Sequence, residues 1–123
     1  MNTHGKINYV ELAAAELDAT KGFFIKAFGW SFADYGAEYT AFSDAGLEGG
    51  FYRAPLKARA ENGSALVVLY SDNLAETRNQ VVVAGGIILK EMYEFPGGRR
   101  FHFAEPSGNE FAAWSEPACA IPI

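Results

Sequence analysis

The chain has 123 residues, half of them hydrophobic and 20% charged, a composition that suits one globular domain and excludes intrinsic disorder. Its net charge of -5 argues against a nucleic-acid partner, because a phosphate backbone would be repelled. No segment approaches the roughly 20 apolar residues of a membrane span, and the single cysteine, Cys119, cannot form an internal disulfide. We therefore expect a cytoplasmic protein without nucleic-acid or membrane partners.

The first half of the chain predicts a strand, a helix and three further strands. Residues 6–13 alternate as a strand does, and because both of its faces carry apolar residues, we expect both to be covered. Apolar residues from Phe23 to Phe28 recur at helical spacing, which predicts a helix over residues 18–28 that ends at Gly29. Three short runs typical of strands follow, at residues 30–35, 39–43 and 47–53.

The second half repeats this order after a linker. Residues 54–63 have no periodicity and carry Pro, Asn and Gly, which indicates a linker. A strand, a helix and three strands are then predicted at residues 64–70, 72–84, 87–93, 101–104 and 111–114. With an offset of 57, the halves align Leu12 with Leu69, Leu17 with Leu74, Thr20 with Thr77 and Gly29 with Gly86. Because half a chain cannot bury an apolar sheet face alone, we expect modules over about residues 5–55 and 63–116 to form one domain, 1–123.

The stretch from residue 95 to 116, FPGGRRFHFAEPSGNEFAAWSE, predicts a hairpin of two apolar strands joined by a polar turn, and we expect it to form one wall of a binding site. Its segment FHFAEPSGNEF, with FFIKAFGW at residues 23–30 and Gly85-Gly86, resembles the vicinal oxygen chelate superfamily, which groups glyoxalase I, bleomycin-resistance proteins and extradiol dioxygenases. The resemblance implies an α+β fold in which two βαβββ modules form a cupped mixed sheet. It also implies a homodimer that completes this sheet.

The resemblance further implies where a metal site would lie. Enzymes of this superfamily usually hold a divalent metal through His and Glu side chains on the first and last strands of each module. Carried over to this chain, three of the four positions fall on Tyr9, Leu66 and Ala112, and the fourth falls within residues 47–52, where Glu48 is the only plausible ligand. Because leucine and alanine offer no oxygen or nitrogen donor, we expect no metal and no other cofactor.

Strand alternation extends this set to a predicted cup. If Tyr9 faces the cup, Glu11 does too, and Val68 and Trp114 join Leu66 and Ala112. In the final hairpin we expect Arg100 and His102 to face the cup and their phenylalanine neighbours to face the helices, and Phe51 or Tyr52 to add an aromatic ring. Glu110 is interpreted as a charge beside the turn, and Trp114 and Tyr9 could equally fill a core or a dimer seam. The predicted ligand-binding residues are Tyr9, Glu11, Phe51, Leu66, Val68, Arg100, His102 and Trp114.

Three functions remain open at this point. The missing metal ligands, the negative charge and the aromatic cup favour a metal-independent small-molecule binding protein, similar to bleomycin-resistance proteins, for an aromatic ligand that can be cationic. The first alternative is a glyoxalase-like lyase or isomerase, or a dioxygenase-related enzyme, with Glu11 or Glu48 as general base, His102 as proton shuttle and Arg100 as electrophile. The second alternative is a dimerisation domain with a vestigial pocket.

Overall fold

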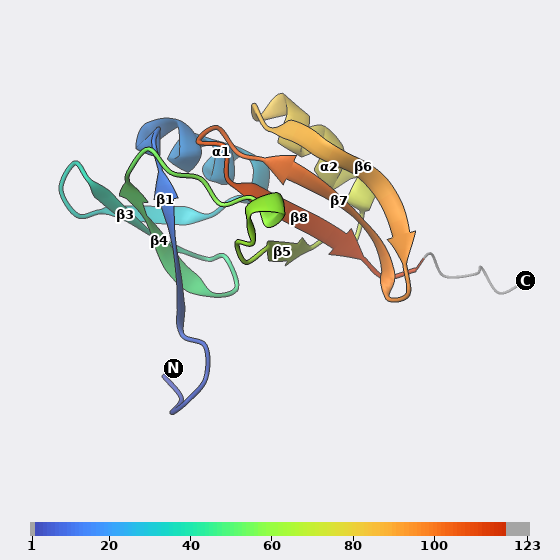
Figure 1. Ribbon diagram of the computed structural model, residues 1–123, viewed down its shortest axis with the longest axis horizontal. Coiled ribbons are helices and arrows are strands. Elements are labelled where there is room, and N and C mark those ends of the chain that lie inside the picture. The colour runs from blue at the N-terminus through green and yellow to red at the C-terminus, as the bar shows by residue number, and fades with distance from the viewer. Residues whose placement is uncertain (1, 118–123) are drawn as a thin grey trace, which may run out of the picture.

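The computed structural model describes residues 2–117, so Cys119 lies outside the described residues (Figure 1). The predicted order of strand, helix and three strands is confirmed in both halves, and neither helix of residues 2–117 is long and apolar enough to span a membrane. The elements are β1 (Tyr9–Ala14), α1 (Leu17–Phe28), β2 (Ser31–Asp34), β3 (Tyr39–Ser43), β4 (Glu48–Arg53), η1 (Ala60–Asn62), β5 (Val67–Tyr70), α2 (Leu74–Val83), β6 (Ile87–Phe95), β7 (Gly98–Ala104) and β8 (Glu110–Ser115).

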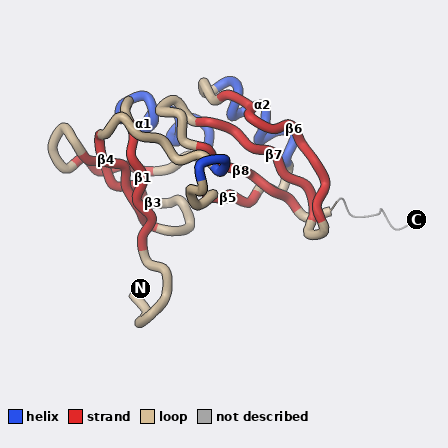
Figure 2. Tube along the Cα trace, in the orientation of Figure 1, coloured by secondary structure: helices blue, strands red, loops and turns tan. Residues whose placement is uncertain are grey.

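Within the described residues these elements form two four-stranded sheets, ordered β1-β4-β3-β2 and β5-β8-β7-β6. We call them the N-terminal and the C-terminal sheet. In each sheet the first strand runs parallel to the last strand of its own half, and the other neighbours are antiparallel. Both helices lie on one side of the molecule, and we call the opposite side of each sheet its open face (Figures 1 and 2). The arrangement confirms the α+β fold of two βαβββ modules.

The core between the helices and the sheets is built from aromatic side chains of both modules. Phe24 of α1 stacks on Trp30 with ring centroids 4.2 Å apart, and it also contacts Phe51 of β4 and Phe111 of β8. Phe111 in turn stacks on Phe103 of β7 at 5.9 Å. Because alternate residues of a strand face opposite sides, these phenylalanines face the helices and the residues between them, such as His102 of β7, face the open side.

The ends of two elements differ from the sequence-based expectation. β1 begins at Tyr9 rather than at residue 6, and on its open side Tyr9 is 42% exposed and Glu11 is also exposed. The prediction that both faces of this strand are covered is therefore wrong for a single chain, because the helices cover only one face of each sheet. α2 begins at Leu74, since Asn73 caps it by accepting the backbone N–H of Glu76 at 3.2 Å.

The turn at residues 105–109, between β7 and β8, fastens the C-terminal module to the N-terminal one. The side chain of Asn109 is fully buried. Its amide group donates to the carbonyl oxygen of Ala13 at 2.7 Å and accepts from the backbone N–H of Ala58 at 2.8 Å. This part of the motif that carries the family resemblance therefore holds the two modules and the linker together.

The same turn also contacts the start of α1. Ser107 Oγ accepts from the backbone N–H of Glu16 at 3.0 Å and lies 2.6 Å from Thr20 Oγ1. Glu105 is only 2% exposed, and its burial raises the pKa of its carboxyl group, although hydrogen bonds from Thr20 and from the backbone of Asn109 work in the opposite direction. The junction therefore makes the charged form of this carboxyl group more costly than it is in water.

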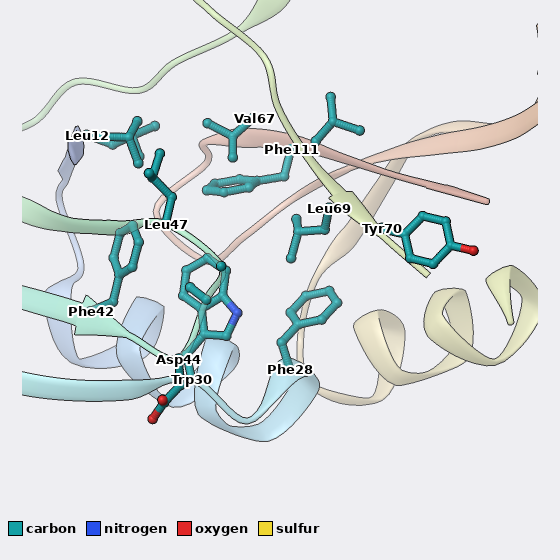
Figure 3. Close-up of a pocket in the computed structure, with 14 residues that line it drawn as sticks. Leu12, Phe28, Trp30, Phe42, Asp44, Leu47, Val67, Leu69, Tyr70 and Phe111 are labelled. Atoms are coloured by element: carbon teal, nitrogen blue, oxygen red, sulfur yellow. The ribbon is translucent and has the colours of Figure 1, made fainter. Parts of the chain in front are cut away.

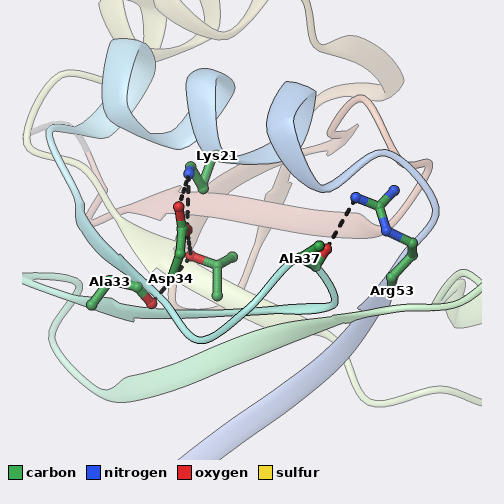
Figure 4. A network of polar contacts seen from close by, with 6 residues as sticks. Lys21, Ala33, Asp34, Ala37 and Arg53 are labelled. Atoms are coloured by element: carbon green, nitrogen blue, oxygen red, sulfur yellow. Dashed lines mark hydrogen bonds and ion pairs between the residues drawn. The ribbon is translucent and has the colours of Figure 1, made fainter.

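A second polar network ties the outer edge of the N-terminal sheet to α1 (Figure 4). Lys21 of α1 pairs with Asp34 of β2 at 2.9 Å, and Thr40 Oγ1 donates to the same carboxylate at 2.9 Å. These hydrogen bonds, that of Lys21 first, hold the pKa of Asp34 below its usual range. Arg53, at the end of β4, donates to the carbonyl oxygen of Ala37 at 3.2 Å. This exposed network is explained by its structural role.

Candidate functional site

The open face of the C-terminal sheet carries a continuous chain of four polar side chains. Glu110 Oε2 lies 2.7 Å from His102 Nδ1, and His102 Nε2 lies 2.8 Å from the hydroxyl of Tyr93. Arg100 donates from Nε to the same hydroxyl. The backbone N–H of Ala60, in the linker, donates to the other oxygen of Glu110 at 2.9 Å. We call the four side chains the relay; it joins the half-buried carboxylate of Glu110 to the half-buried phenol of Tyr93.

Strand register explains why these side chains meet. Arg100 pairs with Tyr93 across β6 and β7, and His102 pairs with Ala112 across β7 and β8. Glu110 precedes Ala112 by two residues, so it lies on the same face and diagonally next to His102. The relay is thus a direct consequence of a hairpin that places four polar residues on the side away from the helices.

The hydrogen bonds of the relay run in one direction. Because Arg100 Nε donates to the oxygen of Tyr93, the phenolic proton is available to His102 Nε2, and His102 Nδ1 then donates to Glu110. Burial alone would raise the pKa of Glu110, but the hydrogen bonds from His102 and the linker backbone, with the nearby charge of Arg59, hold it below its usual range. A charged Glu110 fixes the orientation and tautomer of the imidazole.

Positive charge and aromatic rings surround the relay. The ammonium group of Lys90 lies 4.5 Å from the ring centroid of Tyr93. The guanidinium carbon of Arg100 lies 5.4 Å from the same centroid and 5.3 Å from that of Phe95. Trp114, half-buried, contacts Phe95 edge-to-face at 6.3 Å. This face is therefore basic and aromatic, which suits a planar anion.

The open face of the N-terminal sheet has the opposite character. Tyr39 of β3 donates to Glu11 Oε2 of β1 at 2.9 Å, and its hydroxyl also bonds to that of Tyr9. Burial and the hydrogen bonds to these two neighbours raise the pKa of Tyr39. Gly50 lies beneath the two phenols, where a Cβ atom would overlap the Tyr39 hydroxyl and come within 2.7 Å of that of Tyr9. This face is acidic and aromatic.

A cleft separates the two sheets. β1 and β5 lie at the ends of their sheets, and the described residues show no ladder between them. The gap holds a cavity of about 570 Å³, within the size range typical of small-molecule sites, and Asp44 is one of the residues at its border (Figure 3). Its aromatic and aliphatic lining comes from both modules and includes Phe28, Trp30, Phe42, Leu69, Tyr70 and Phe111.

The structure divides the predicted ligand-binding residues among three places. The strand alternation expected for the hairpin is observed, since the phenylalanines of β7 face the core and the polar residues between them face the open side. The C-terminal open face carries Arg100, His102, Trp114 and, at its β5 edge, Val68; the N-terminal open face carries Tyr9 and Glu11; and Leu66 lies just before β5. In a single chain they do not form one continuous set.

Phe51 contradicts the prediction. Its ring is fully buried on the helix side of β4, against Phe24 and Phe42. Alternation along β4 instead directs Gly50 and Tyr52 to the open face, and Tyr52 is 38% exposed there. The aromatic contribution of this strand therefore comes from Tyr52, the other residue that the sequence allowed.

Strand pairing also identifies the fourth family metal position. Gly50 pairs with Glu11 across β1 and β4, as Ala112 pairs with Val68 across β5 and β8. The position equivalent to Ala112 is therefore Gly50, and Glu48 lies two residues before it, exposed, at the start of β4. The interpretation of Glu48 as the residue at this position is wrong.

The four positions do not fit a metal ion. Gly50, Leu66 and Ala112 have no side-chain donor atom, and the hydroxyl of Tyr9 is hydrogen-bonded to Tyr39. In the part of the chain that the structure describes, no group of three or more His, Cys, Asp or Glu side chains could hold a metal. At the positions that the family resemblance implies, this chain therefore offers no set of side-chain metal ligands.

Sequence reasoning missed three residues of these faces. Glu110 was interpreted as a charge beside the turn, and this is wrong, because it is hydrogen-bonded to His102. The predicted strand ends at Tyr93, whereas β6 continues to Phe95, and Tyr93 pairs with Arg100 of β7. Tyr39 was not singled out. Counting residues outward from the turn of the final hairpin would have predicted that Glu110 lies next to His102. No local sequence signal identifies Tyr93 or Tyr39.

Comparisons with known proteins agree with the fold. The family model described as Glyoxalase/Bleomycin resistance protein/Dioxygenase superfamily matches residues 6–113. A glyoxalase-related enzyme from Fulvimarina pelagi superimposes with a TM-score of 0.75 at 17% identity, over 91% of this chain and 88% of that one. The fosfomycin resistance protein FosX from Listeria monocytogenes gives 0.76 at 14% identity, over 94% and 97%.

Lactoylglutathione lyase from Agrobacterium tumefaciens gives a TM-score of 0.68 at 16% identity, over 93% of this chain and 96% of that chain. A search of curated proteins finds no significant match. At these identities the structural likeness shows the fold and leaves the chemistry to the residues themselves. Because the family model covers most of the chain, the protein belongs to the Glyoxalase/Bleomycin resistance protein/Dioxygenase superfamily.

Proposed function

We propose that the protein is a metal-independent small-molecule binding protein that holds an aromatic ligand, cationic ligands included, in the cleft between its modules. The observation that carries the proposal is the cleft itself. It has a volume of about 570 Å³, and its lining combines the half-buried Phe28 and the exposed Tyr70 with the buried core rings of Trp30, Phe42 and Phe111. A cavity with such a lining suits a flat apolar molecule.

The preference for an aromatic molecule that can carry positive charge follows from two features of the lining. Phe28, Trp30 and Phe42 present ring faces and edges to the space. A stacked or edge-on ring contributes about 0.5–1.5 kcal/mol beyond its buried area. Asp44 adds a carboxylate, held by Ser31 Oγ at 2.6 Å, that can pair with a cationic group.

Metal independence is proposed from the donor set. The four superfamily positions offer no set of oxygen and nitrogen ligands, so the binding energy has to come from apolar contact and from the carboxylate. Elemental analysis of protein purified without chelator tests this part. A stoichiometric transition metal would contradict it.

Fluorescence of Trp30 tests the cleft. The chain has two tryptophans, so Trp114→Phe leaves Trp30 as a single reporter within the cavity. Quinoline and N-methylquinolinium are matched probes that share one shape and differ in charge. We expect both to quench Trp30 and to raise the melting temperature, the cation at lower concentration. Asp44→Asn should remove the advantage of the cation and leave quinoline binding unchanged.

A filling variant supplies the control for location. Leu69→Phe adds volume inside the cleft, whereas Val83→Phe adds the same ring at a 70% exposed position on α2. We expect the first to weaken both probes by at least about tenfold, the scale of one lost apolar contact, and the second to have no effect. Absence of quenching by either probe at millimolar concentration would contradict the proposal.

The predicted homodimer is part of the same proposal. Tyr9, Tyr52, Val68 and Tyr70 are between 38% and 54% exposed, and they belong to the edge strands β1 and β5 and to β4 beside β1. A second copy of the chain would cover these residues. Sedimentation velocity at micromolar concentration tests this, and a monomer over the whole accessible range would contradict it.

A further inference from the structure

We propose that the open face of the C-terminal sheet is a metal-free proton-transfer site for aromatic 2-oxo acids, in which Tyr93 exchanges the proton and Arg100 binds the carboxylate or the enolate oxygen. This inference does not rest on the proposed binding cleft, because the residues that carry it lie on another face. It starts from the relay, a polar network that the N-terminal sheet lacks at the equivalent positions.

The relay contains the groups that can activate a hydroxyl for proton transfer. A carboxylate orients an imidazole, the imidazole nitrogen faces a hydroxyl, and a guanidinium group donates to the hydroxyl oxygen. In this order His102 can accept the proton of Tyr93 while Glu110 stabilises the imidazolium that forms, and Arg100 stabilises the phenolate. Glu110 and His102 act through Tyr93 and are positioning residues.

The charges around Tyr93 select an anion. Among the described residues, Arg100 uses only Nε in a recorded hydrogen bond, so both of its Nη groups can bind a carboxylate. Lys90 places a second positive charge 4.5 Å from the ring of Tyr93. The carboxylate of this cluster, Glu110, is already engaged by His102 and the linker backbone. An incoming anion is therefore attracted by Arg100 and Lys90, while the negative charge of Glu110 is already hydrogen-bonded to other groups.

The rings next to Arg100 select an aromatic anion. Phe95 lies 5.3 Å from the guanidinium carbon, and Trp114 contacts Phe95 on the same face. Both side chains are half-buried and present ring surface beside the charged groups. A molecule with a ring and a carboxylate a few bonds apart can contact both at once, with its acidic C–H bond next to Tyr93.

The equivalent region of the N-terminal sheet shows that a sheet of this type can form without such a relay. Glu48 precedes Gly50 as Glu110 precedes Ala112, yet Glu48 is exposed and has no recorded hydrogen bond among the described residues. The position equivalent to His102, paired with Gly50, is Ala41. The same sheet therefore forms without a carboxylate–imidazole pair, which favours a chemical role for the pair in the C-terminal module.

The proposed reaction is a balanced keto–enol conversion. Tyr93 Oη passes its proton to His102 Nε2 and takes a proton from the carbon next to the substrate carbonyl. The C–H bond breaks, its electron pair forms the C=C bond, and the negative charge moves to the carbonyl oxygen, which Arg100 stabilises. That oxygen then takes the proton from Tyr93, and His102 returns its own proton to Tyr93. No oxidant, reductant or cofactor is consumed.

Deuterium exchange into phenylpyruvate tests the site. The C3 protons of this aromatic 2-oxo acid are followed by NMR in deuterated buffer, with and without the full chain. We expect the wild-type protein to accelerate exchange at least about tenfold over buffer and Tyr93→Phe to return it to the buffer rate. Arg100→Gln should mainly raise KM. Wild-type protein no faster than buffer would overturn the proposal, whatever the variants do.

Two matched glutamine variants separate a positioning role from a structural one. Glu110→Gln should lower kcat, leave KM within about twofold and change the pH profile of kcat, because it removes the charge that supports the imidazolium. Glu48→Gln, at the equivalent place in the other module, should change none of these. Unchanged kcat in Glu110→Gln, or full activity in a folded Tyr93→Phe, would overturn the proposal. Val83→Phe, at a 70% exposed position on α2, should leave exchange unaffected.

Discussion

The two modules of this chain share one frame and differ at nearly every position of the open faces. Glu11 pairs with Gly50 as Val68 pairs with Ala112, so the registers of the two parallel pairs are equivalent. The N-terminal face nevertheless carries phenols and a carboxylate, and the C-terminal face carries the relay with an added lysine. The comparison teaches that the helix-facing residues determine this fold, while the open faces are free to diverge in charge.

The hairpin turns of the two modules differ as much as their faces. The turn at residues 105–109 is docked onto the first module through Asn109, which is fully buried. Its counterpart at residues 44–47 lines the cleft instead, with Asp44 in the left-handed region at a φ of 59°. The turn at residues 105–109 therefore holds the two modules together, whereas the turn at residues 44–47 borders the cleft.

Removing the docked side chain should have the largest effect on this comparison. Asn109→Ala deletes hydrogen bonds to Ala13 and Ala58 and leaves a buried carbonyl and a buried N–H without their partner. We expect a loss of about 3 kcal/mol in the free energy of unfolding, from two buried groups at 1–3 kcal/mol each. Urea denaturation measures it. Asn79→Ala, at an exposed position of α2, is the control and should change stability by less than about 0.5 kcal/mol.

The second prediction compares the two equivalent glutamates. Glu110→Gln should lower stability at pH 7 by about 2 kcal/mol, because it weakens the buried bond to His102, whereas Glu48→Gln should have no measurable effect. The folded pKa of Glu110 is lowered, so its contribution is present above the unfolded value of about 4.5 and is lost as the pH falls through the folded pKa.

The stability difference between wild type and Glu110→Gln should therefore shrink below pH 4.5. Chemical denaturation from pH 7 to pH 3 measures both variants. A difference that stays constant over this range, or an equal loss in Glu48→Gln, would show that the two modules do not differ in the way described.

The smallest predicted effect concerns Gly50. An alanine there would push its Cβ into the hydroxyl of Tyr39 and displace the bond from Tyr39 to Glu11, so we expect a loss of about 1 kcal/mol. The phenols can move because they are the ends of side chains, which limits the cost. Thermal denaturation of Gly50→Ala measures it. Gly22→Ala, where a Cβ meets open space on α1, should instead be neutral or stabilising.

Sequence patterns predicted the fold because its signals are local. The spacing of Phe23, Phe24 and Phe28 identified α1, and the offset of 57 aligned Leu17 with Leu74, which are the first residues of the two helices and are both buried. Missing donors at Leu66 and Ala112 were also readable, because a side chain without oxygen or nitrogen cannot bind a cation in any environment.

The sequence by itself therefore determined the module order, most of the helix-facing core and the residues at three of the four metal positions that the family resemblance implies. Tertiary structure alone decided that Phe51 is in the core and Tyr52 is on the open face, since a shift of one residue in strand register exchanges the two faces. It also decided that Glu110 belongs to His102 and that Asn109 joins the modules, because these contacts depend on strand pairing and on separations of up to 96 residues.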